Sequence, residues 1–194
     1  MEETMTPTLP EWLYPPRASG WEADDLDHIP NLPRHTELID GALIFMVSPQ
    51  RSWHDRVVRR LTAALEDQAP EESTVEAQMT VRLSVKSRPE PDVIAATVAY
   101  DPDRTCFLPE DVALVVEVVS EESQERDRET MPFKYARAGI RHFWRVEEEH
   151  GLPVVHAYEL DDTTRTYVPT GIHRERVKTS VPFGIDIDLA RLTR

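Results

Sequence analysis

Alternating and continuous runs of apolar residues predict a chain that is rich in strands. Residues 37–47 are β-rich, and the Asp40-Gly41 pair within them is typical of the tight turn of a hairpin. Further strands are expected at 74–83, 92–98, 112–119, 141–147, 153–160 and 165–168. The run at 112–119 is almost continuously apolar, which is typical of a strand that is covered on both faces.

Two helices are expected between these strands. The first begins at Ser52, in a sequence similar to a capping box, and extends to about Asp67. Its apolar face contains Val57, Val58, Leu61, Ala64 and Leu65. His54 falls on that same side. The second helix is short, follows the charge-dense segment 121–129 and ends at Gly139. Because helices and strands alternate in only part of the chain, the pattern favours one α/β or α+β domain with a mixed central sheet.

Composition divides the chain into two parts. Its 194 residues carry a formal net charge of −14, and the length suffices for a hydrophobic core without disulfides. Residues 1–33 carry −6 of this charge and contain six prolines, whereas the remaining 161 residues carry −8. We therefore interpret residues 1–34 as an acidic, proline-rich arm and residues 35–194 as the folded domain. The arm residues expected to pack onto that domain are Trp12, Leu13, Tyr14 and Trp21.

Several classes of protein are disfavoured. The acidity does not suit indiscriminate binding of nucleic acid over the whole surface. The longest apolar run, about eight residues, is shorter than the roughly 20 residues that span a membrane. The first residues lack the basic and apolar regions of a signal peptide. Cys106 is the sole cysteine, which excludes an intrachain disulfide and a cysteine zinc cluster. We expect a cytoplasmic protein with no membrane partner.

Two acidic residues carry the chemical interpretation. Glu117 lies inside the apolar run 112–119, where an ionised carboxylate costs several kcal/mol unless it is paired or bound to a metal. A strand edge or a structural ion pair would also explain it. Asp92 follows Pro91 and precedes another apolar run, a position that is also typical of a turn. If the two strands are neighbours, both carboxylates converge and suit Mg²⁺ or Mn²⁺, which prefer oxygen ligands.

The order and spacing of these residues resemble the PD-(D/E)xK nuclease core and, more narrowly, the Uma-type restriction endonuclease family. The supporting segments are Pro91-Asp92, Glu117-Val118-Val119-Ser120, Glu37-Leu38-Ile39-Asp40-Gly41, His54, Asp127-Arg128, residues 135–139 and residues 142–144. The resemblance covers roughly residues 35–190. It implies a restriction-endonuclease-like mixed β-sheet flanked by helices, and a DNA endonuclease that hydrolyses phosphodiester bonds with Mg²⁺ or Mn²⁺.

The resemblance also implies roles for individual residues. Asp92 and Glu117 would hold the metal ion, which would activate a water molecule and stabilise charge on the phosphate. Glu37 would be a third acid near the same site, or else an exposed residue at a strand end. His54 would line the site, or else belong to the core.

The chain departs from the family pattern at its cation. The nuclease core places a lysine two residues after the second acid, where this chain has Val119, and the Uma-type arrangement Asp-Arg-x-x-Lys puts it at Met131. Lys134 is displaced from Met131 by about 60° around a helix and about 4.5 Å along it. Pro132 is harmless if the helix starts there, and bends the helix if it starts near Asp127. Either Lys134 substitutes for the missing lysine, or the site is weakened or inactive.

The expected partner is DNA, with a homodimer left open. Arg56, Arg59 and Arg60 share one face of the first helix, where they would contact phosphates or form an ordinary solvated face. No base-reading motif is recognisable, so no sequence specificity is predicted. Two rival functions remain: a nuclease-fold module that binds DNA or a partner without catalysis, and a metal-dependent hydrolase of another phosphate ester.

Overall fold

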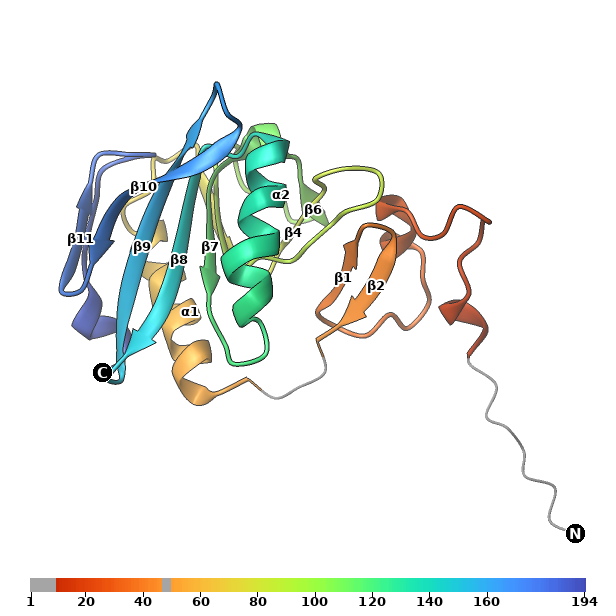
Figure 1. Cartoon of the computed structure of the whole chain (residues 1–194), viewed down its shortest axis with the longest axis horizontal. Helices are drawn as coiled ribbons and strands as arrows, with labels where there is room; N and C mark the ends of the chain where they lie inside the picture. The colour runs from red at the N-terminus through yellow and green to blue at the C-terminus, as the bar shows by residue number, and fades with distance from the viewer. Residues whose placement is uncertain (1–9, 47–49) are drawn as a thin grey trace, which may run out of the picture.

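A six-stranded mixed sheet forms the centre of the molecule (Figure 1). The computed structural model describes residues 10–46 and 50–194. The strand order is β10-β9-β8-β7-β5-β3, with β7 and β8 parallel and the other neighbours antiparallel. The strands are β3 Thr74–Ala77, β5 Val93–Ala96, β7 Val112–Val118, β8 His142–Glu149, β9 Leu152–Asp161 and β10 Thr166–His173. The predicted mixed α/β architecture is confirmed.

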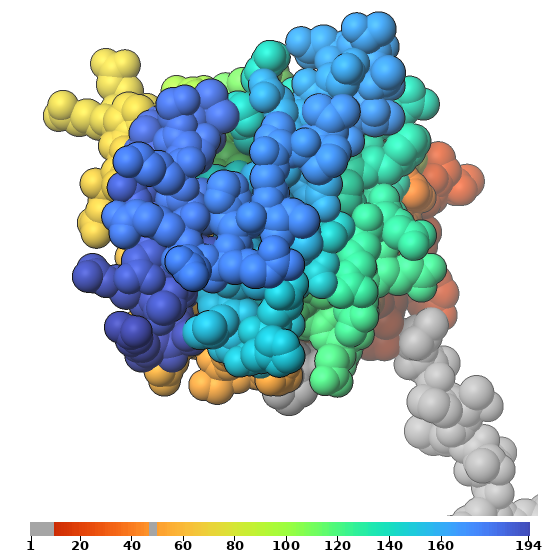
Figure 2. All heavy atoms as spheres, turned by 60° about the vertical axis from the view of Figure 1, so that its left-hand side comes forward, coloured from red at the N-terminus to blue at the C-terminus, as the bar shows by residue number. Residues whose placement is uncertain are grey.

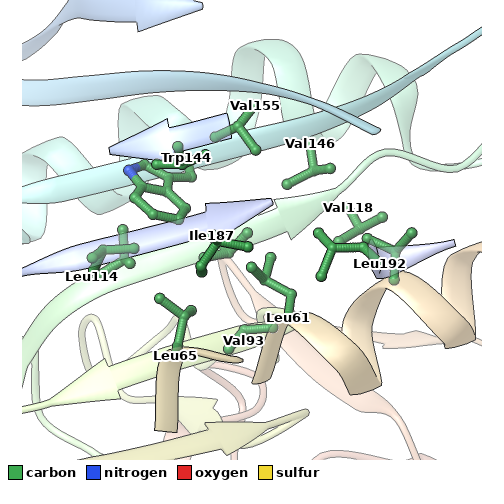
Figure 3. Packing of buried hydrophobic residues seen from close by; sticks show 14 of the residues in the cluster. Leu61, Leu65, Val93, Leu114, Val118, Trp144, Val146, Val155, Ile187 and Leu192 are labelled. Atoms are coloured by element: carbon green, nitrogen blue, oxygen red, sulfur yellow. The ribbon is translucent and has the colours of Figure 1, made fainter. Parts of the chain in front are cut away.

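One helix covers each face of the sheet. Helix α1, Ser52–Glu66, packs on one face together with the hairpin of β11, Arg176–Thr179, and β12, Ile185–Asp188, and with the short helix η5, Leu189–Leu192. Figure 3 shows the apolar side chains of this layer, including Leu61, Leu114 and Ile187. Helix α2, Met131–Ala138, packs on the opposite face.

Strand β7 supplies both hydrophobic layers. Leu114, Val116 and Val118 contact the layer of α1, whereas Val115 contacts the layer of α2. Because successive side chains of a strand point to opposite faces, Glu117 belongs to the α2 face. The same alternation explains why the run is apolar throughout: both faces are covered.

The predicted first hairpin forms beside the central sheet. Strands β1, Thr36–Ile39, and β2, Ala42–Phe45, are antiparallel, and Asp40-Gly41 connects them with positive φ angles of 51° and 84°. Two positive φ angles are what a tight hairpin turn requires. The expected last residue of this hairpin, Val47, lies outside the described residues.

The preceding segment packs against this hairpin. It contains the short helices η1, Glu11–Leu13, and η2, Ala23–Asp27. Trp21 and Leu26 are buried with Leu38 of β1, and Trp12 meets the ring of Phe45 edge-on. Tyr14 was expected to pack onto the body, but its side chain is 59% exposed and this expectation was wrong. The division of the chain at residue 34 stays a prediction.

Two local predictions were wrong, and two further features were not predicted. Ser52 is the first residue of α1 and not its cap, since Arg51 occupies the cap without a side-chain hydrogen bond. The run 74–83 is two strands, because Gln78 has a φ of 56° and breaks it. Its second part, β4 Thr80–Val81, pairs with β6, Cys106–Phe107, which the pattern did not predict. The hairpin of β11 and β12 was not predicted either.

A π-helical turn, η4 Arg126–Thr130, leads into α2. The N–H of Met131 donates to the carbonyl of Arg126, five residues earlier. Pro132 therefore lies in the first turn of α2 and follows a widened turn, where its missing donor is tolerated. The helix ends at Gly139, as predicted, with a left-handed φ of 92°.

Candidate active site

The pairing of β5 with β7 brings the two predicted acids together. In this antiparallel ladder Val93 pairs with Val116, so Asp92 comes opposite Glu117. Asp92 Oδ2 accepts a hydrogen bond of 2.7 Å from the N–H of Val118, which fixes the carboxylate at this end of the sheet. The sheet neighbourhood on which the metal hypothesis depended is therefore present.

Glu117 is 2% exposed and points into the α2 face. The hydroxyl of Tyr135 on α2 donates to its Oε1 at 2.6 Å. Burial raises the pKa of Glu117 well above its usual range, and the nearby carboxylates of Asp127 and Asp92 raise it further. Glu117 is thus a buried acid whose ionised form lacks sufficient positive charge nearby.

Arg126 is the cation of this cluster. It forms ion pairs with Glu37 and with Asp127, the latter at 3.3 Å between Nε and Oδ1. Burial opposes the charge of Arg126, but Glu37, Glu117 and Asp127 outweigh it, so the pKa of Arg126 is raised and the guanidinium stays protonated. Burial raises the pKa of Asp127 to about 6.

Glu37 faces this cluster and is 2% exposed. Its Oε1 accepts the backbone N–H of Glu90 at 2.8 Å, and its Oε2 pairs with Arg126. Burial raises the pKa of Glu37. Since both of its oxygens have partners within the protein, Glu37 is arranged to hold Arg126 in place.

His54 lies at the first turn of α1 and is 6% exposed. Its Nε2 is 3.4 Å from Asp92 Oδ2. Burial lowers the pKa of His54, but the contact with Asp92 outweighs burial and the net pKa is raised. His54 therefore lies on the apolar side of α1 but contacts Asp92, so its environment is not purely hydrophobic.

An adjacent cleft is lined by residues that include Glu37, His54, Glu90, Asp92, Ser120 and Arg126, whereas Glu117 and Asp127 are buried and do not line it. The carboxyl groups of Glu37, Glu117 and Asp127 interact with the guanidinium of Arg126, and Asp92 lines the same cleft as Arg126. Among residues 10–46 and 50–194, no three His, Cys, Asp or Glu side chains form a preassembled metal site.

The structure does not bring the other expected cations to this cleft. Lys134 pairs with Asp40 in the hairpin turn, at 2.6 Å. Met131, at the expected lysine position, is 1% exposed within the α2-side core. The three arginines of α1 have other partners: Arg56 and Arg60 donate to the carbonyls of Thr193 and Arg191, and Arg59 pairs with Asp55.

Sequence reasoning missed Arg126. The motif contains Asp127-Arg128, but Arg128 pairs with Glu147 on the outer surface. The available signal was the charge-dense segment 121–129, which does not indicate which arginine faces inward. Residues two apart on a helical turn point in nearly opposite directions, so one of Arg126 and Arg128 faces inward while the other faces outward.

Comparison with known proteins now identifies the family. Residues 23–190 match the family model Uma2, described as "Putative restriction endonuclease". The chain belongs to the Uma2 family. The Uma-type resemblance inferred from the sequence is thereby confirmed, and Uma2 membership links the chain to nucleases.

Solved structures support the fold of this Uma2 protein. The crystal structure of "a putative nuclease belonging to DUF820" from Anabaena variabilis ATCC 29413 matches with a TM-score of 0.67 and 13% identity. The match covers 88% of this chain and 96% of that chain. At this identity the likeness shows the fold alone. A comparison with curated proteins finds no match. None of the helices in the described ranges is long and apolar enough to cross a membrane.

Proposed function

We propose that this Uma2 protein is a metal-dependent endonuclease that hydrolyses phosphodiester bonds of DNA. The observation that carries the proposal is the convergence of Asp92 and the buried Glu117 from neighbouring strands, with Arg126 and Asp92 lining one cleft. Paired acids next to a fixed cation are the groups that phosphodiester hydrolysis needs, because negative charge develops on the phosphate.

The residues of the cleft fit Mg²⁺ or Mn²⁺. Their donors are carboxylate oxygens, which both ions prefer, and their negative charge exceeds the charge of Arg126. Mg²⁺ is commonly held by one or two carboxylates together with water and substrate phosphate, so a preassembled set of three ligands is not required. Asp92 and Glu117 would hold the ion. When bound, it would lower the pKa of a water molecule and stabilise charge on the phosphate.

The protein's own groups would orient this chemistry. The hydroxyl of Tyr135 fixes Glu117, and the N–H of Val118 fixes Asp92. Glu37 holds Arg126 at the cleft, where the guanidinium would pair with a non-bridging phosphate oxygen. In this proposal Arg126, and not Lys134, supplies the positive charge that the family pattern places at residue 131.

The direct test is cleavage of plasmid and single-stranded DNA with Mg²⁺ or Mn²⁺. Asp92→Ala is expected to lower the rate by about 100-fold or more, because a single group that stabilises the transition state contributes that much. Asp55→Ala is the matched control, since Asp55 is an exposed acid of α1 that pairs with Arg59. Equal rates for wild type and Asp92→Ala would assign the cleavage to a contaminant or to another site.

A binding module without catalysis is the second candidate, and the burial of Met131 favours it. A methionine in the core cannot stabilise a phosphate. Calorimetry with Mg²⁺ separates the two functions: an enzyme of the proposed type binds the ion through Asp92 and Glu117, whereas a binding module shows no such affinity.

A further inference from the structure

A second hollow lies on the α2 side of the sheet, outside the cleft described above. It has a volume of about 300 Å³ and shares no lining residue with that cleft. Its walls are α2 on one side and strands β8, β9 and β10 on the other. Figure 2 shows the α2 segment beside the hairpin of β9 and β10. The volume is at the lower end of the range for ligand pockets.

Aromatic rings form the floor and one rim of this hollow. Phe143 is 1% exposed and lies under Tyr158 and Tyr167, whose ring centroids are 5.7 and 5.4 Å away. On the α2 rim, Phe133 is 58% exposed. The guanidinium of Arg137 lies over one face of the Phe133 ring, 5.3 Å from its centroid, so a stacking partner would use the other face.

Three arginines line the same hollow, and no acidic residue does. Arg128 and Arg145 share one carboxylate, that of Glu147, at 2.6 and 2.8 Å. Arg165 forms no salt bridge among the described residues. This excess of positive charge stands out in a chain whose net charge is −14.

The conformation of Arg165 adds a second observation. Its φ is 56°, in the left-handed region that favours glycine, so this turn of the β9–β10 hairpin keeps an arginine where glycine would be less strained. Its guanidinium lies over the C-terminal end of α2, since a Cβ on Gly139 would be 3.3 Å from its Nη2. Compensation of the helix dipole is the structural alternative.

We propose that this aromatic–arginine groove binds a single-stranded segment of nucleic acid. The phosphates would pair with Arg128, Arg145 and Arg165, and an unpaired base would stack on Phe133. Stacking of bases on aromatic rings combined with positive charge along the backbone is how proteins hold single strands, whereas bases in a duplex have no free faces. Here the inference rests on the proposed function in taking nucleic acid as the substrate.

The groove and the cleft are joined by one turn of chain. Within η4, Arg126 faces the cleft and Arg128 faces the groove. A strand held in the groove would therefore be led past this turn toward Asp92 and Glu117. The groove would select substrates that have an unpaired segment next to the cleaved bond.

Binding of a short labelled thymidine oligonucleotide, measured by fluorescence anisotropy in EDTA, tests the stacking. Phe133→Ala is expected to raise the Kd about tenfold, and Phe133→Trp to restore it. Tyr100→Ala is the matched control, because Tyr100 is 70% exposed and lies outside the groove. If Phe133→Leu binds as tightly as wild type, or if a poly-glutamate peptide competes as well as unlabelled oligonucleotide, the proposal is overturned.

The salt dependence of the same binding tests the arginines. Arg128→Ala and Arg165→Ala are each expected to lower the slope of log K against log salt by about 0.7, the value for one phosphate contact of a single strand. Arg174→Ala is the control, since Arg174 is an exposed arginine that pairs with Glu149. An unchanged slope in both groove variants, or an equal slope change in Arg174→Ala, overturns the proposal.

Cleavage assays separate this inference from the proposed function. If oligonucleotide binding depends on Phe133 but Asp92→Ala does not change cleavage, the proposed binding role of the groove is supported and the proposed function fails. If cleavage depends on Asp92 while the KM for single-stranded DNA is the same in wild type and Phe133→Ala, the groove fails and the proposed function stands.

Discussion

Arg126 is a guanidinium that the fold fixes before any substrate binds. Glu37 and Asp127 hold it from two sides, and the raised pKa keeps it charged. An arginine held in this way loses less conformational entropy on pairing with a phosphate than a free lysine does. This makes Arg126 a better source of catalytic charge than Lys134, which pairs with Asp40.

Replacing Arg126 should therefore impair cleavage more than replacing Lys134. Arg126→Ala is expected to lower kcat/KM about 100-fold, and Arg126→Lys to retain part of the activity, because an ammonium keeps the charge but not the paired geometry. Steady-state cleavage of single-stranded DNA measures both. Lys134→Ala should leave the rate unchanged, and a larger loss in Lys134→Ala than in Arg126→Ala would reverse this assignment.

Met131→Lys restores the family's residue at a buried position. Met131 is 1% exposed and lies one helical turn before Tyr135, whose hydroxyl binds Glu117. A lysine there should speed cleavage by adding charge near the acids, while burial of the ammonium should lower the free energy of unfolding by about 1–3 kcal/mol. Urea denaturation and cleavage are measured on the same preparation. Cleavage no faster than wild type would show that Met131 causes no defect.

Asp127 should destabilise the metal-free protein as pH rises. The pKa of Asp127 is raised to about 6 in the folded chain, above its usual value near 4, so between these values the folded state binds more protons than the unfolded state. Ionising Asp127 thus costs stability as pH rises through this window. Asp127→Asn removes that cost, so its stability relative to wild type should increase by about 1–3 kcal/mol between pH 4 and pH 7. Urea denaturation in EDTA at both pH values measures the difference, and a difference that is constant with pH would contradict the assignment.

At the scale of elements, the site depends on the pairing of β5 with β7, which the hydrophobic periodicity of the sequence does not predict. The apolar run at 112–119 indicated a strand covered on both faces, and β7 is that strand. Its antiparallel register with β5 determines that Asp92 comes opposite Glu117. From the sequence, the two acids were expected to converge only if their strands were neighbours in the sheet. The sequence did not establish this, because any strand can in principle pair with several others.

Other elements could not be predicted because they depend on single backbone angles or on tertiary contacts. The positive φ of Gln78 divides an otherwise continuous β pattern. The π-helical turn before α2 is a second such element, because a helical period of 3.6 residues does not predict it. By contrast, the Asp40-Gly41 turn and the helix end at Gly139 were predictable, since local chemistry determines both.

Gly139 permits a specific test at this scale. Its φ of 92° is costly for any residue with a Cβ, and that Cβ would lie 3.3 Å from the guanidinium of Arg165. Gly139→Ala should lower the free energy of unfolding by about 1–2 kcal/mol in urea denaturation. Gly184→Ala is the control, because its added Cβ would meet nothing within 4 Å. Equal stabilities of the two variants would contradict the role of the left-handed cap.

At the scale of the whole molecule, the negative charge is shared between the first 33 residues and the rest of the chain. Residues 1–33 carry −6 of the total −14. Within the described part of that segment, Asp27 is paired with the buried Arg88, and no residue lines the cleft or the aromatic–arginine groove. A local excess of carboxyl groups lies at the candidate site, where Glu37, Glu117 and Asp127 surround Arg126 and Asp92 lines the cleft. We therefore expect weak DNA binding that is sensitive to salt and depends on a divalent ion.

That excess of negative charge predicts that a divalent ion stabilises the folded chain. An ion that binds the native state alone adds RT ln(1 + [L]/Kd), or about 2.7 kcal/mol at a concentration 100 times the Kd. For a domain of this length, each kcal/mol raises the Tm by about 2–4 °C, so saturating Mg²⁺ or Mn²⁺ should raise the Tm by about 5–10 °C. Differential scanning fluorimetry measures the shift without requiring any cleavage.

The matched variants decide where such an ion binds. Asp92→Ala should abolish the shift, whereas Asp55→Ala should keep it, because Asp55 pairs with Arg59 on the exposed side of α1. Sodium chloride at equal ionic strength controls for screening of the acidic surface, which would stabilise both variants alike. A shift of equal size in Asp92→Ala would place the ion elsewhere on the acidic surface. If the ion binds at the cleft and no DNA is cleaved, the chain is a metal-binding member of Uma2 whose catalysis is limited at Met131. The acids would then hold the ion, but the charge of Arg126 would not replace the lysine of the family pattern.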